Sequence, residues 1–534
     1  MSIFENILKY YDFCSGLDDF LKKELSLEEC REIVIERLKR RDDLFLEFVR
    51  ERVFSNDGSP YLKLMETAGI KFEDIESMVK KKGLEGTLRE LAERGVYVTI
   101  DEFKGREVCK RNGHEFRFRE EDFDNRNTKT AFTATSGGTR SAGTPIMMNF
   151  GYVKDCSIFH NILIDAFDLS YYPCVVWFPG ALGALIVIDI VKIGKIPERW
   201  FSQVPWVFQM RNKRFSSLKD ALMINSMRVI GKKHGINLPK PEFIDFDNTI
   251  RVVEAISEII EKNEGCFVTT LTSSALRACK IAKENGIEIE GTYFLVSGEP
   301  VTDSKKKEIE SSGAKVIPYY GSMEAGVIGS GCVNSKETDD CHIMDHYIAL
   351  IQYKKKVKKF GVEVDAFLIT SFLPHAPKTL LNVEMGDFGV IEERSCGCKW
   401  EKLGLKKHIH TIRSFEKLTG EGMTILNTDL IRIVEEVLPG RFGGSITDYQ
   451  IVEREDKEGF TKLEILISPD LGDLDEEKVI DVILTELKIK GKDSGSAALS
   501  VEMWEKAKTI KIKREYPKKT KVGKIFSFQV ESTN

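Results

Sequence analysis

The sequence has no excess of positive charge. Its 79 Lys and Arg residues are outnumbered by 84 Asp and Glu residues, so the formal net charge of the 534-residue chain is −5. Proteins that mainly bind nucleic acid carry a surplus of basic residues that neutralises phosphates. We therefore expect no nucleic acid as the main partner.

Cysteine and long apolar segments are scarce as well. The eleven cysteines are odd in number and mostly scattered, which is typical of a reducing compartment and not of a secreted disulfide scaffold. The first residues show no signal-peptide pattern. The longest apolar run, 181–191, falls short of the roughly 20 residues that span a bilayer and contains Asp189. These features predict a cytoplasmic protein without a membrane span, and they leave its oligomeric state open.

The chain does have the composition of a soluble globular protein, with 42% apolar and 31% charged residues. Its length permits about three domains. Residues 17–53 and 61–91 carry apolar side chains at helical spacing, and Ser26 with Glu29 forms a capping-box pattern. We predict a helix-rich N-terminal region over residues 1–127 that packs on a larger domain.

From residue 128 short apolar runs alternate with helical segments. This alternation predicts an α/β domain with largely parallel strands over residues 128–412. The expected strands are 172–178, 184–190, 266–271, 293–296 and 315–318, the expected helices are 250–262, 273–285 and 304–312, and 365–391 is strand-rich. Residues 413–534 predict a small α+β domain, with helices near 428–437 and 474–487, strands at 446–453 and 462–467, and a last strand before the basic tail.

A loop rich in glycine and hydroxyl groups opens the α/β region, with Thr135-Ser136-Gly137-Gly138-Thr139 at its centre. Hydroxyls and unhindered backbone amides suit the binding of phosphate oxygens. The loop differs from a P-loop because no Gly-Lys-Ser/Thr follows it. Taken alone, such a loop is more often an ordinary turn than an anion-binding site.

Five further segments follow this loop in a characteristic order. The set consists of TSGGT at Thr135–Thr139, SGEP at Ser297–Pro300, YYGSMEAG at Tyr319–Gly326, GDFG at Gly386–Gly389, Arg413, and VGK at Val522–Lys524. In this order and spacing the chain resembles the adenylate-forming enzyme superfamily, especially its phenylacetate-CoA ligase branch. The resemblance runs from about residue 60 to the C-terminus.

The resemblance implies a large N-terminal α/β domain and a small, mobile C-terminal domain, with ATP bound between them. It also implies two half-reactions. A carboxylic acid first attacks the α-phosphate of ATP to give an acyl-adenylate, and a thiol or amine then displaces AMP. ATP, Mg²⁺ and a small carboxylic acid are the expected ligands, with coenzyme A as the co-substrate of the second step.

Individual residues receive roles from the same resemblance. Lys524 resembles the mobile lysine that neutralises charge while one anion attacks another. Arg413 is expected to contact ribose or phosphate, and Glu324 resembles the glutamate that binds Mg²⁺. Asp387 resembles the acid that accepts hydrogen bonds from both ribose hydroxyls. The other residues expected around the nucleotide are Thr135, Ser136, Gly137, Gly138, Thr139, Arg140, Ser297, Gly298, Glu299, Pro300, Tyr320, Gly321 and Ser322.

Two segments depart from the family pattern. Arg140, Ser141 and Ala142 lengthen the glycine-rich loop, and Phe415 with Glu416 stands where the family has an acidic or basic pivot between its domains. In the family the small C-terminal domain rotates about this pivot between the two half-reactions. The altered residues therefore put the second half-reaction in doubt more than the first. The alternatives are an adenylating enzyme that passes the acyl group to an amine, a carrier protein or a protein thiol, and a catalytically weakened nucleotide-binding relative.

A group of thiols and a histidine follows these motifs. Cys396 and Cys398 form a Cys-X-Cys pair after the GDFG segment, and Cys332 and His342 precede it. Three thiolates and an imidazole suit a tetrahedral structural zinc. The alternative interpretation is that these cysteines are small buried apolar groups.

Four aromatic residues of the α/β region are candidates for a substrate pocket. Phe178, Trp200, Phe201 and Trp206 are consistent with an apolar acyl pocket or, as is more common, with the protein core. The sequence does not predict which carboxylic acid is used.

Overall fold

The computed structural model describes the chain except for a set of short segments. These are residues 1–2, 129, 136–144, 204–215, 358–361, 415–416, 421–422, 427–429, 431, 457–459, 491–503, 506, 519–527 and 531–534. Most of the glycine-rich loop, both pivot residues, Trp206 and Lys524 therefore lie outside the described residues.

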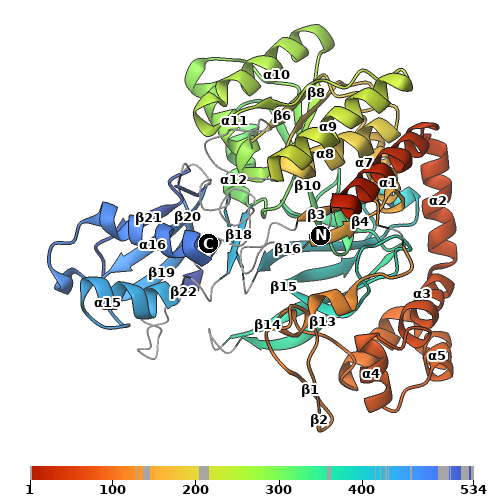
Figure 1. Cartoon of the computed structure of the whole chain (residues 1–534). Helices are drawn as coiled ribbons and strands as arrows, with labels where there is room; N and C mark the ends of the chain where they lie inside the picture. The colour runs from red at the N-terminus through yellow and green to blue at the C-terminus, as the bar shows by residue number, and fades with distance from the viewer. Residues whose placement is uncertain are drawn as a thin grey trace.

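A mixed sheet of twelve strands forms the centre of the molecule (Figure 1). One half is parallel and contains, in spatial order, β7 (Glu242–Phe243), β6 (Arg199–Ser202), β5 (Cys174–Trp177), β8 (Cys266–Leu271), β9 (Thr292–Ser297) and β10 (Lys315–Ser322). The antiparallel half continues with β11 (Gly326–Gly331), β12 (Cys341–Ile343), β16 (Lys407–Ser414), β15 (Leu380–Glu393), β14 (Val362–Ser371) and β13 (Ile348–Val357).

Helices cover both faces of the parallel half (Figure 1). One face carries α7 (Phe150–Ala166), α8 (Gly180–Lys192) and α9 (Ser216–Lys233), and the other carries α10 (Ile250–Asn263), α11 (Thr272–Asn285) and α12 (Asp303–Glu310). Successive strand residues point to opposite faces. In β8, for example, Phe267 joins the first core and Val268 the second. The expected α/β architecture is confirmed, including the three helices predicted for 250–312.

The strand expected at 184–190 is wrong, because these residues belong to α8. A continuous apolar run is compatible with a buried strand or with a helix that is enclosed on all sides. Here α8 packs against α7, α9, β5 and α1 (Ile3–Leu21). All but one of residues 184–190 are buried, so this run shows no polar face that would produce a helical period.

The N-terminal residues are helical, as predicted. After α1 come α2 (Leu27–Lys39), α3 (Arg41–Val49), η1 (Arg50–Phe54), α4 (Pro60–Thr67), α5 (Phe72–Glu93) and α6 (Ile100–Phe103), followed by a small hairpin of β1 (Cys109–Arg111) and β2 (His114–Phe116) and by η2 (Glu120–Phe123). The Ser26–Glu29 capping box is present. Apolar side chains of these helices share one continuous core with the antiparallel half of the sheet.

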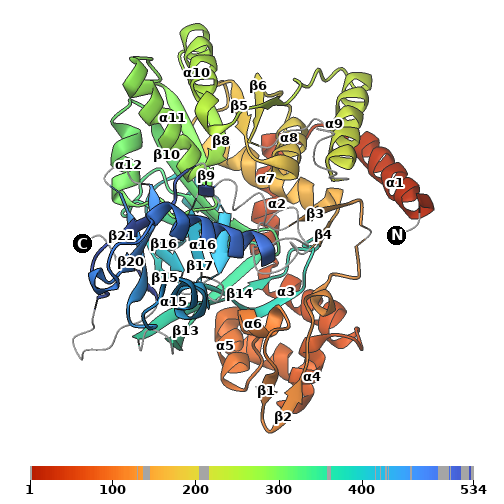
Figure 2. The same ribbon diagram turned by 60° about the vertical axis from the view of Figure 1, so that its left-hand side comes forward.

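The C-terminal residues form a separate unit beside the sheet (Figures 1 and 2). A hairpin of β17 (Lys417–Gly420) and β18 (Met423–Leu426) leads to η4 (Ile433–Val437), α15 (Leu438–Phe442), β19 (Tyr449–Glu455), β20 (Thr461–Ile467), η5 (Pro469–Leu471), α16 (Glu476–Lys490), β21 (Ile510–Lys513) and β22 (Phe528–Val530). Their sheet has the order β21-β20-β19-β22 and its own apolar core.

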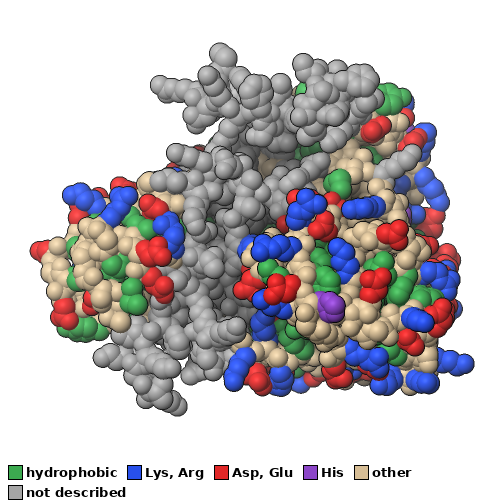
Figure 3. All heavy atoms as spheres, turned by 60° about the horizontal axis from the view of Figure 1, so that its bottom comes forward, with side chains coloured by type: hydrophobic (Ala, Val, Ile, Leu, Met, Phe, Trp, Pro, Cys, Tyr) green, Lys and Arg blue, Asp and Glu red, His purple; other side chains and the backbone are tan. Residues whose placement is uncertain are grey.

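The remaining short elements are β3 (Phe132–Thr135) paired with β4 (Pro145–Met148), η3 (Phe246–Asn248) and α13 (Lys399–Lys402). Among the described helices, none combines the length and the apolar character needed to cross a bilayer. On the face shown in Figure 3, Lys and Arg side chains are interspersed with Asp and Glu over the described surface.

Candidate functional site

Two of the predicted segments meet at the carboxyl edge of the parallel strands. β9 and β10 run parallel with Val296 opposite Pro318. Ser297–Pro300 at the end of β9 and Tyr319–Ser322 at the end of β10 therefore lie side by side. In open α/β sheets, ligands bind at this edge.

The SGEP segment is fixed by its own glutamate. Glu299 is buried, and its Oε1 accepts a hydrogen bond from Ser273 Oγ (2.6 Å) while its Oε2 lies 3.8 Å from Lys305 Nζ. The preceding Gly298 has φ +86°, a backbone conformation that residues other than glycine rarely adopt. The carboxylate thus holds the loop in shape, and the backbone of the segment is what faces a nucleotide in our prediction.

Tyr320 and Asp387 are brought together from distant strands. The Tyr320 hydroxyl donates to Asp387 Oδ2 at 2.8 Å. Burial, together with the Asp387 charge, raises the pKa of Tyr320 well above its ordinary value, so the phenol stays a neutral donor. Asp387 lies on β15 opposite Ser414, and Phe388 lies opposite Arg413. Of the predicted nucleotide residues, Tyr320 and Asp387 are therefore in contact, and Arg413 lies on the adjoining strand β16.

Arg413 is held by a carboxylate that the sequence interpretation did not single out. Its Nη1 donates to Asp339 Oδ2 at 2.9 Å, and its side chain is 40% exposed. Asp339 also accepts the backbone N–H groups of Thr411 (2.7 Å) and Ile412 (2.9 Å). One buried carboxylate thus fixes both the end of β16 and the guanidinium that projects from it.

Glu324 lies in the tight turn between β10 and β11, and it is buried. Lys104 Nζ lies 3.3 Å from its Oε1 and donates at 2.6 Å to Glu120 Oε1. Burial lowers the pKa of Lys104, but the attraction of Glu324 and Glu120 outweighs it and raises the pKa above its ordinary value. The ammonium group is therefore charged and shared between two carboxylates.

Two small residues shape this turn. Ser322 Oγ accepts the backbone N–H of Ala325 at 3.1 Å. A Cβ atom at Gly321 would lie 2.7 Å from the carbonyl oxygen of Gly326, so no other residue fits without moving the β10–β11 backbone. The motif's glycine is thus required by the local packing, whatever its ligand.

The glycine-rich loop is described only at its ends. Thr135 closes β3 and lies opposite Pro145 of β4, so the two ends of the loop are held together. Ser136, Gly137, Gly138, Thr139 and Arg140 lie outside the described residues, as does Lys524. Their predicted roles remain predictions.

The four predicted zinc ligands do cluster. One ligand atom from each of Cys332, His342, Cys396 and Cys398 lies within 4.8 Å of all the others. His342 Nδ1 contacts the Leu405 carbonyl (2.9 Å), which leaves Nε2 facing the sulfurs of Cys398 (3.1 Å) and Cys396 (3.5 Å). Cys332 and His342 lower the pKa of Cys398 to about 3, against the effect of burial. The cluster has a composition and a size that could hold a metal ion.

A second group next to it already contains its counter-charge. Cys332, Asp340 and His408 also place ligand atoms within 4.8 Å of one another. Asp340 accepts from Arg394 and lies 2.7 Å from His408 Nδ1. The Arg394 guanidinium thus neutralises the charge of this carboxylate.

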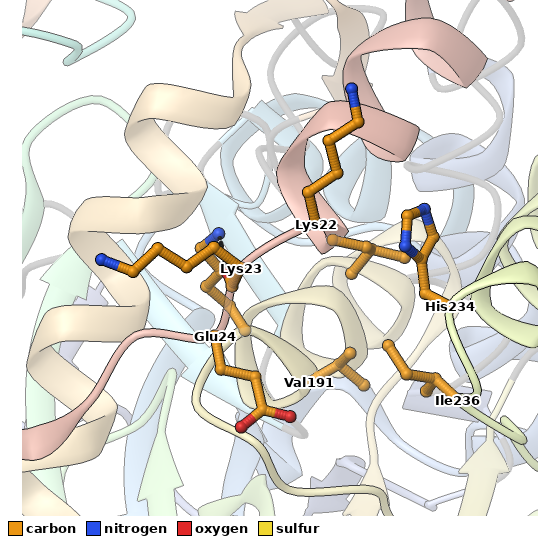
Figure 4. A pocket seen from close by; sticks show the side chains of 8 residues that line it. Lys22, Lys23, Glu24, Val191, His234 and Ile236 are labelled. Atoms are coloured by element: carbon orange, nitrogen blue, oxygen red, sulfur yellow. Dashed lines mark hydrogen bonds between the residues drawn. The ribbon is translucent and has the colours of Figure 1, made fainter.

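A pocket of about 510 Å³ lies away from these residues (Figure 4). It is lined by Leu21, Lys22, Lys23, Glu24, Val191, Lys192, His234 and Ile236. Val191 and Lys192 end α8, which returns from the carboxyl edge of β5 to the opposite edge of the sheet. Lys192 Nζ donates to the carbonyl groups of Phe20 and Lys23 (both 2.5 Å), and Lys22 pairs with Asp19 (2.6 Å). Lys192 therefore connects the end of α8 to the end of α1.

The aromatic residues considered for an acyl pocket belong to the core. Phe178, Trp200 and Phe201 are each 2% exposed or less. The more common interpretation of these residues is therefore confirmed for the three that the structure describes.

No protein-family model matches the sequence, and no curated protein matches it either. Among solved structures, 2-hydroxyisobutyryl-CoA ligase in complex with 2-HIB-AMP and CoA in the thioesterification state is similar with a TM-score of 0.54 and 13% identity, over 94% of this chain and 90% of the ligase. An amide bond synthetase from Marinactinospora thermotolerans aligns with a TM-score of 0.39 and 14% identity, over 83% of this chain and 76% of the synthetase. The likeness to the CoA ligase extends over nearly the whole of both chains. This chain therefore has the fold of the adenylate-forming enzymes, as the order of its sequence motifs predicts.

Proposed function

We propose that this chain activates a carboxylic acid with ATP as an acyl-adenylate and then transfers the acyl group to coenzyme A. The observation that carries the proposal is the contact between Tyr320 and Asp387 beside the carboxyl edge of β9 and β10, with Arg413 on the adjoining strand β16. The same fold in a ligase that was solved with an acyl-adenylate and CoA supports it.

In the first half-reaction a carboxylate oxygen of the substrate bonds to the α-phosphorus of ATP, and the bond to the bridging oxygen breaks to release pyrophosphate. Asp387, fixed by the Tyr320 hydroxyl, is suited to accept both ribose hydroxyls. Arg413, fixed by Asp339, is suited to stabilise phosphate charge. The glycine-rich loop and Lys524 supply further donors in this proposal.

In the second half-reaction a thiol sulfur bonds to the acyl carbon, the acyl–phosphate bond breaks, and AMP leaves while the thiol proton passes to solvent. We propose that residues 413–534 are the domain that moves between the steps. Arg413 and Ser414 lie at the end of β16 in the large sheet, and the strands after them form two sheets of their own, one of which has its own core. Both observations support a boundary at residue 413, with residues 1–127 and 128–412 as the two earlier regions.

Magnesium is the metal that this chemistry implies. Glu324 offers a buried carboxylate, and hard oxygen ligands of this kind fit Mg²⁺. When bound, Mg²⁺ neutralises charge on the phosphates of ATP. Glu324 is the residue that we propose as its protein ligand.

We propose zinc for the cluster of Cys332, His342, Cys396 and Cys398. In a tetrahedral shell with Zn–S bonds of about 2.3 Å, neighbouring sulfurs lie about 3.8 Å apart. The four ligand atoms, all within 4.8 Å of one another, match that scale. All four positions carry protein ligands, so the zinc is structural. None of the eleven cysteines is in a disulfide, which supports the reducing, cytoplasmic location that we propose.

Carboxylate-dependent exchange of pyrophosphate into ATP tests the first half-reaction. We expect exchange with at least one member of a panel of aliphatic and aromatic acids. Lys524→Ala should abolish the exchange and leave ATP affinity nearly intact, because the lysine acts on charge that develops during the attack. Normal exchange by Lys524→Ala would refute the role given to that lysine.

AMP release with different acceptors tests the second half-reaction. Coenzyme A should stimulate AMP release in the presence of the active acid. Pyrophosphate exchange without stimulation by coenzyme A would contradict coenzyme A as the acyl acceptor. It would favour an amine, a carrier protein or a protein thiol instead. Nucleotide binding without any exchange would leave only a nucleotide-binding relative of these enzymes.

A further inference from the structure

One buried cation lies at the carboxylate to which we assign Mg²⁺. Lys104 follows α6, a short helix of the N-terminal region that begins with a capping box between Thr99 and Glu102. Its Nζ lies 3.3 Å from Glu324 Oε1 and 2.6 Å from Glu120 Oε1. The three side chains are 17%, 8% and 8% exposed, respectively, so little water screens their charges.

The two contacts of Lys104 are unequal. The shorter one, to Glu120, has the length of a strong charge-assisted hydrogen bond, and the longer one, to Glu324, does not. Glu120 is itself anchored, because its backbone carbonyl accepts Lys378 Nζ at 3.0 Å, and Lys378 pairs with Asp124 at 2.6 Å. Glu120 can therefore keep the ammonium group when Glu324 is engaged elsewhere.

From this geometry we infer that Lys104 is an internal counter-ion that competes with the divalent cation for Glu324, and that Glu120 receives Lys104 when the metal binds. The inference rests on the proposed function for the identity of the metal. It makes Lys104 and Glu120 positioning residues of the metal site. They neutralise Glu324 while the site holds no metal, and they set how much divalent cation is needed to occupy it.

The two partners predict opposite effects on metal affinity. Lys104→Met removes the competing positive charge, so the half-saturating concentration of free divalent cation should fall about tenfold. Glu120→Gln removes the carboxylate that would receive Lys104, so the ammonium group stays at Glu324. The half-saturating concentration of free divalent cation should then rise several-fold. A purely structural role for the cluster would weaken metal binding in both variants, so the difference in sign is diagnostic.

The test uses Mn²⁺ as the spectroscopic probe and the full-length protein. Free Mn²⁺ is measured by electron paramagnetic resonance, with and without the non-hydrolysable analogue α,β-methylene-ATP. The free-Mg²⁺ dependence of pyrophosphate exchange gives a second readout. Lys104→Arg keeps the charge and should remain close to the unmodified protein. Lys110→Met, at an exposed pair with Glu115 (2.7 Å), is the matched control for loss of a lysine.

Each outcome decides the inference. Opposite shifts for Lys104→Met and Glu120→Gln, with loss of the Mn²⁺ site in Glu324→Gln, support it. Shifts in the same direction, unchanged affinities, or full Mn²⁺ binding by Glu324→Gln overturn it. If Lys104→Met fails to fold in a thermal melt, Glu120→Gln alone still decides by the sign of its shift. Absence of exchange in the unmodified protein refutes the proposed function instead, and the Mn²⁺ titrations remain informative.

Discussion

At the scale of single residues, the candidate site is built from side chains that fix other side chains. Tyr320 fixes Asp387, and Asp339 fixes Arg413. The sequence motifs identify Tyr320, Asp387 and Arg413 as candidates, but they give no sign of Asp339, Lys104 or Glu120. These three belong to no recognised motif, and only the folded chain brings them to the others.

Asp339→Asn tests this supporting role. The amide keeps the size of the side chain and loses the charge that holds the guanidinium, which removes a charge-assisted hydrogen bond worth about 1.5–3 kcal/mol. We expect the KM for ATP in the exchange reaction to rise about tenfold or more. The matched control is Asp365→Asn, whose carboxylate is 47% exposed and pairs with Lys354 at 2.8 Å. An unchanged KM for ATP in Asp339→Asn would contradict the role of Asp339.

At the scale of elements, local patterns predicted most helices and strands but not their assembly. The alternation after residue 128 and the capping box at Ser26 describe short stretches of chain, and both are confirmed. The run 184–190 was assigned to the wrong element because burial on all sides removes periodicity. The six antiparallel strands β11 to β16 join the parallel strands in one sheet through pairings between residues far apart in sequence. Local sequence patterns do not predict such pairings. The order of the sequence motifs predicted the fold as a whole, because a family likeness contains long-range information that local patterns lack.

The residues of the candidate zinc cluster, Cys332, His342, Cys396 and Cys398, come from different elements. Cys332 follows β11, His342 lies on β12, and Cys398 precedes α13. β12 also pairs with β16, the strand that contains Arg413. We expect metal analysis to find one zinc per chain in the unmodified protein and far less in Cys398→Ser, together with a lower Tm. Loss of a structural zinc removes binding energy that contributes to folding. Cys341→Ser is the control, since Cys341 is buried on the same strand outside the cluster and should retain zinc. Equal zinc contents in both variants would favour the interpretation as small buried apolar groups.

At the scale of the whole molecule, the described contacts between the C-terminal unit and the body include those of Phe460 and Thr461 at the start of β20. Phe460 is 8% exposed and belongs to the core beneath α10, α11 and α12, with the Arg277 guanidinium carbon 5.6 Å from the centre of its ring. The next residue, Thr461, accepts a hydrogen bond from Lys305 Nζ at 3.3 Å. Lys305 also donates to the Pro300 carbonyl at 3.2 Å. Through Lys305, the C-terminal unit is therefore connected to the Ser297–Pro300 segment that we propose to lie beside the nucleotide.

Phe460→Ala should therefore release the C-terminal unit without unfolding it. Burial of a phenylalanine side chain contributes about 1.5–3 kcal/mol, so its removal should lower the docked population by about tenfold or more. The unit keeps its own core, which Phe460 does not join. We expect faster limited proteolysis between residues 413 and 430 and a larger radius of gyration in X-ray scattering, with unchanged far-UV circular dichroism. Tyr516→Ala is the control, because Tyr516 is an aromatic residue of the same unit with 62% of its surface exposed. If Phe460→Ala were cleaved no faster than the control, Phe460 would not be the residue that holds the C-terminal unit in place. The orientation of this unit would then depend on the segment after Arg413.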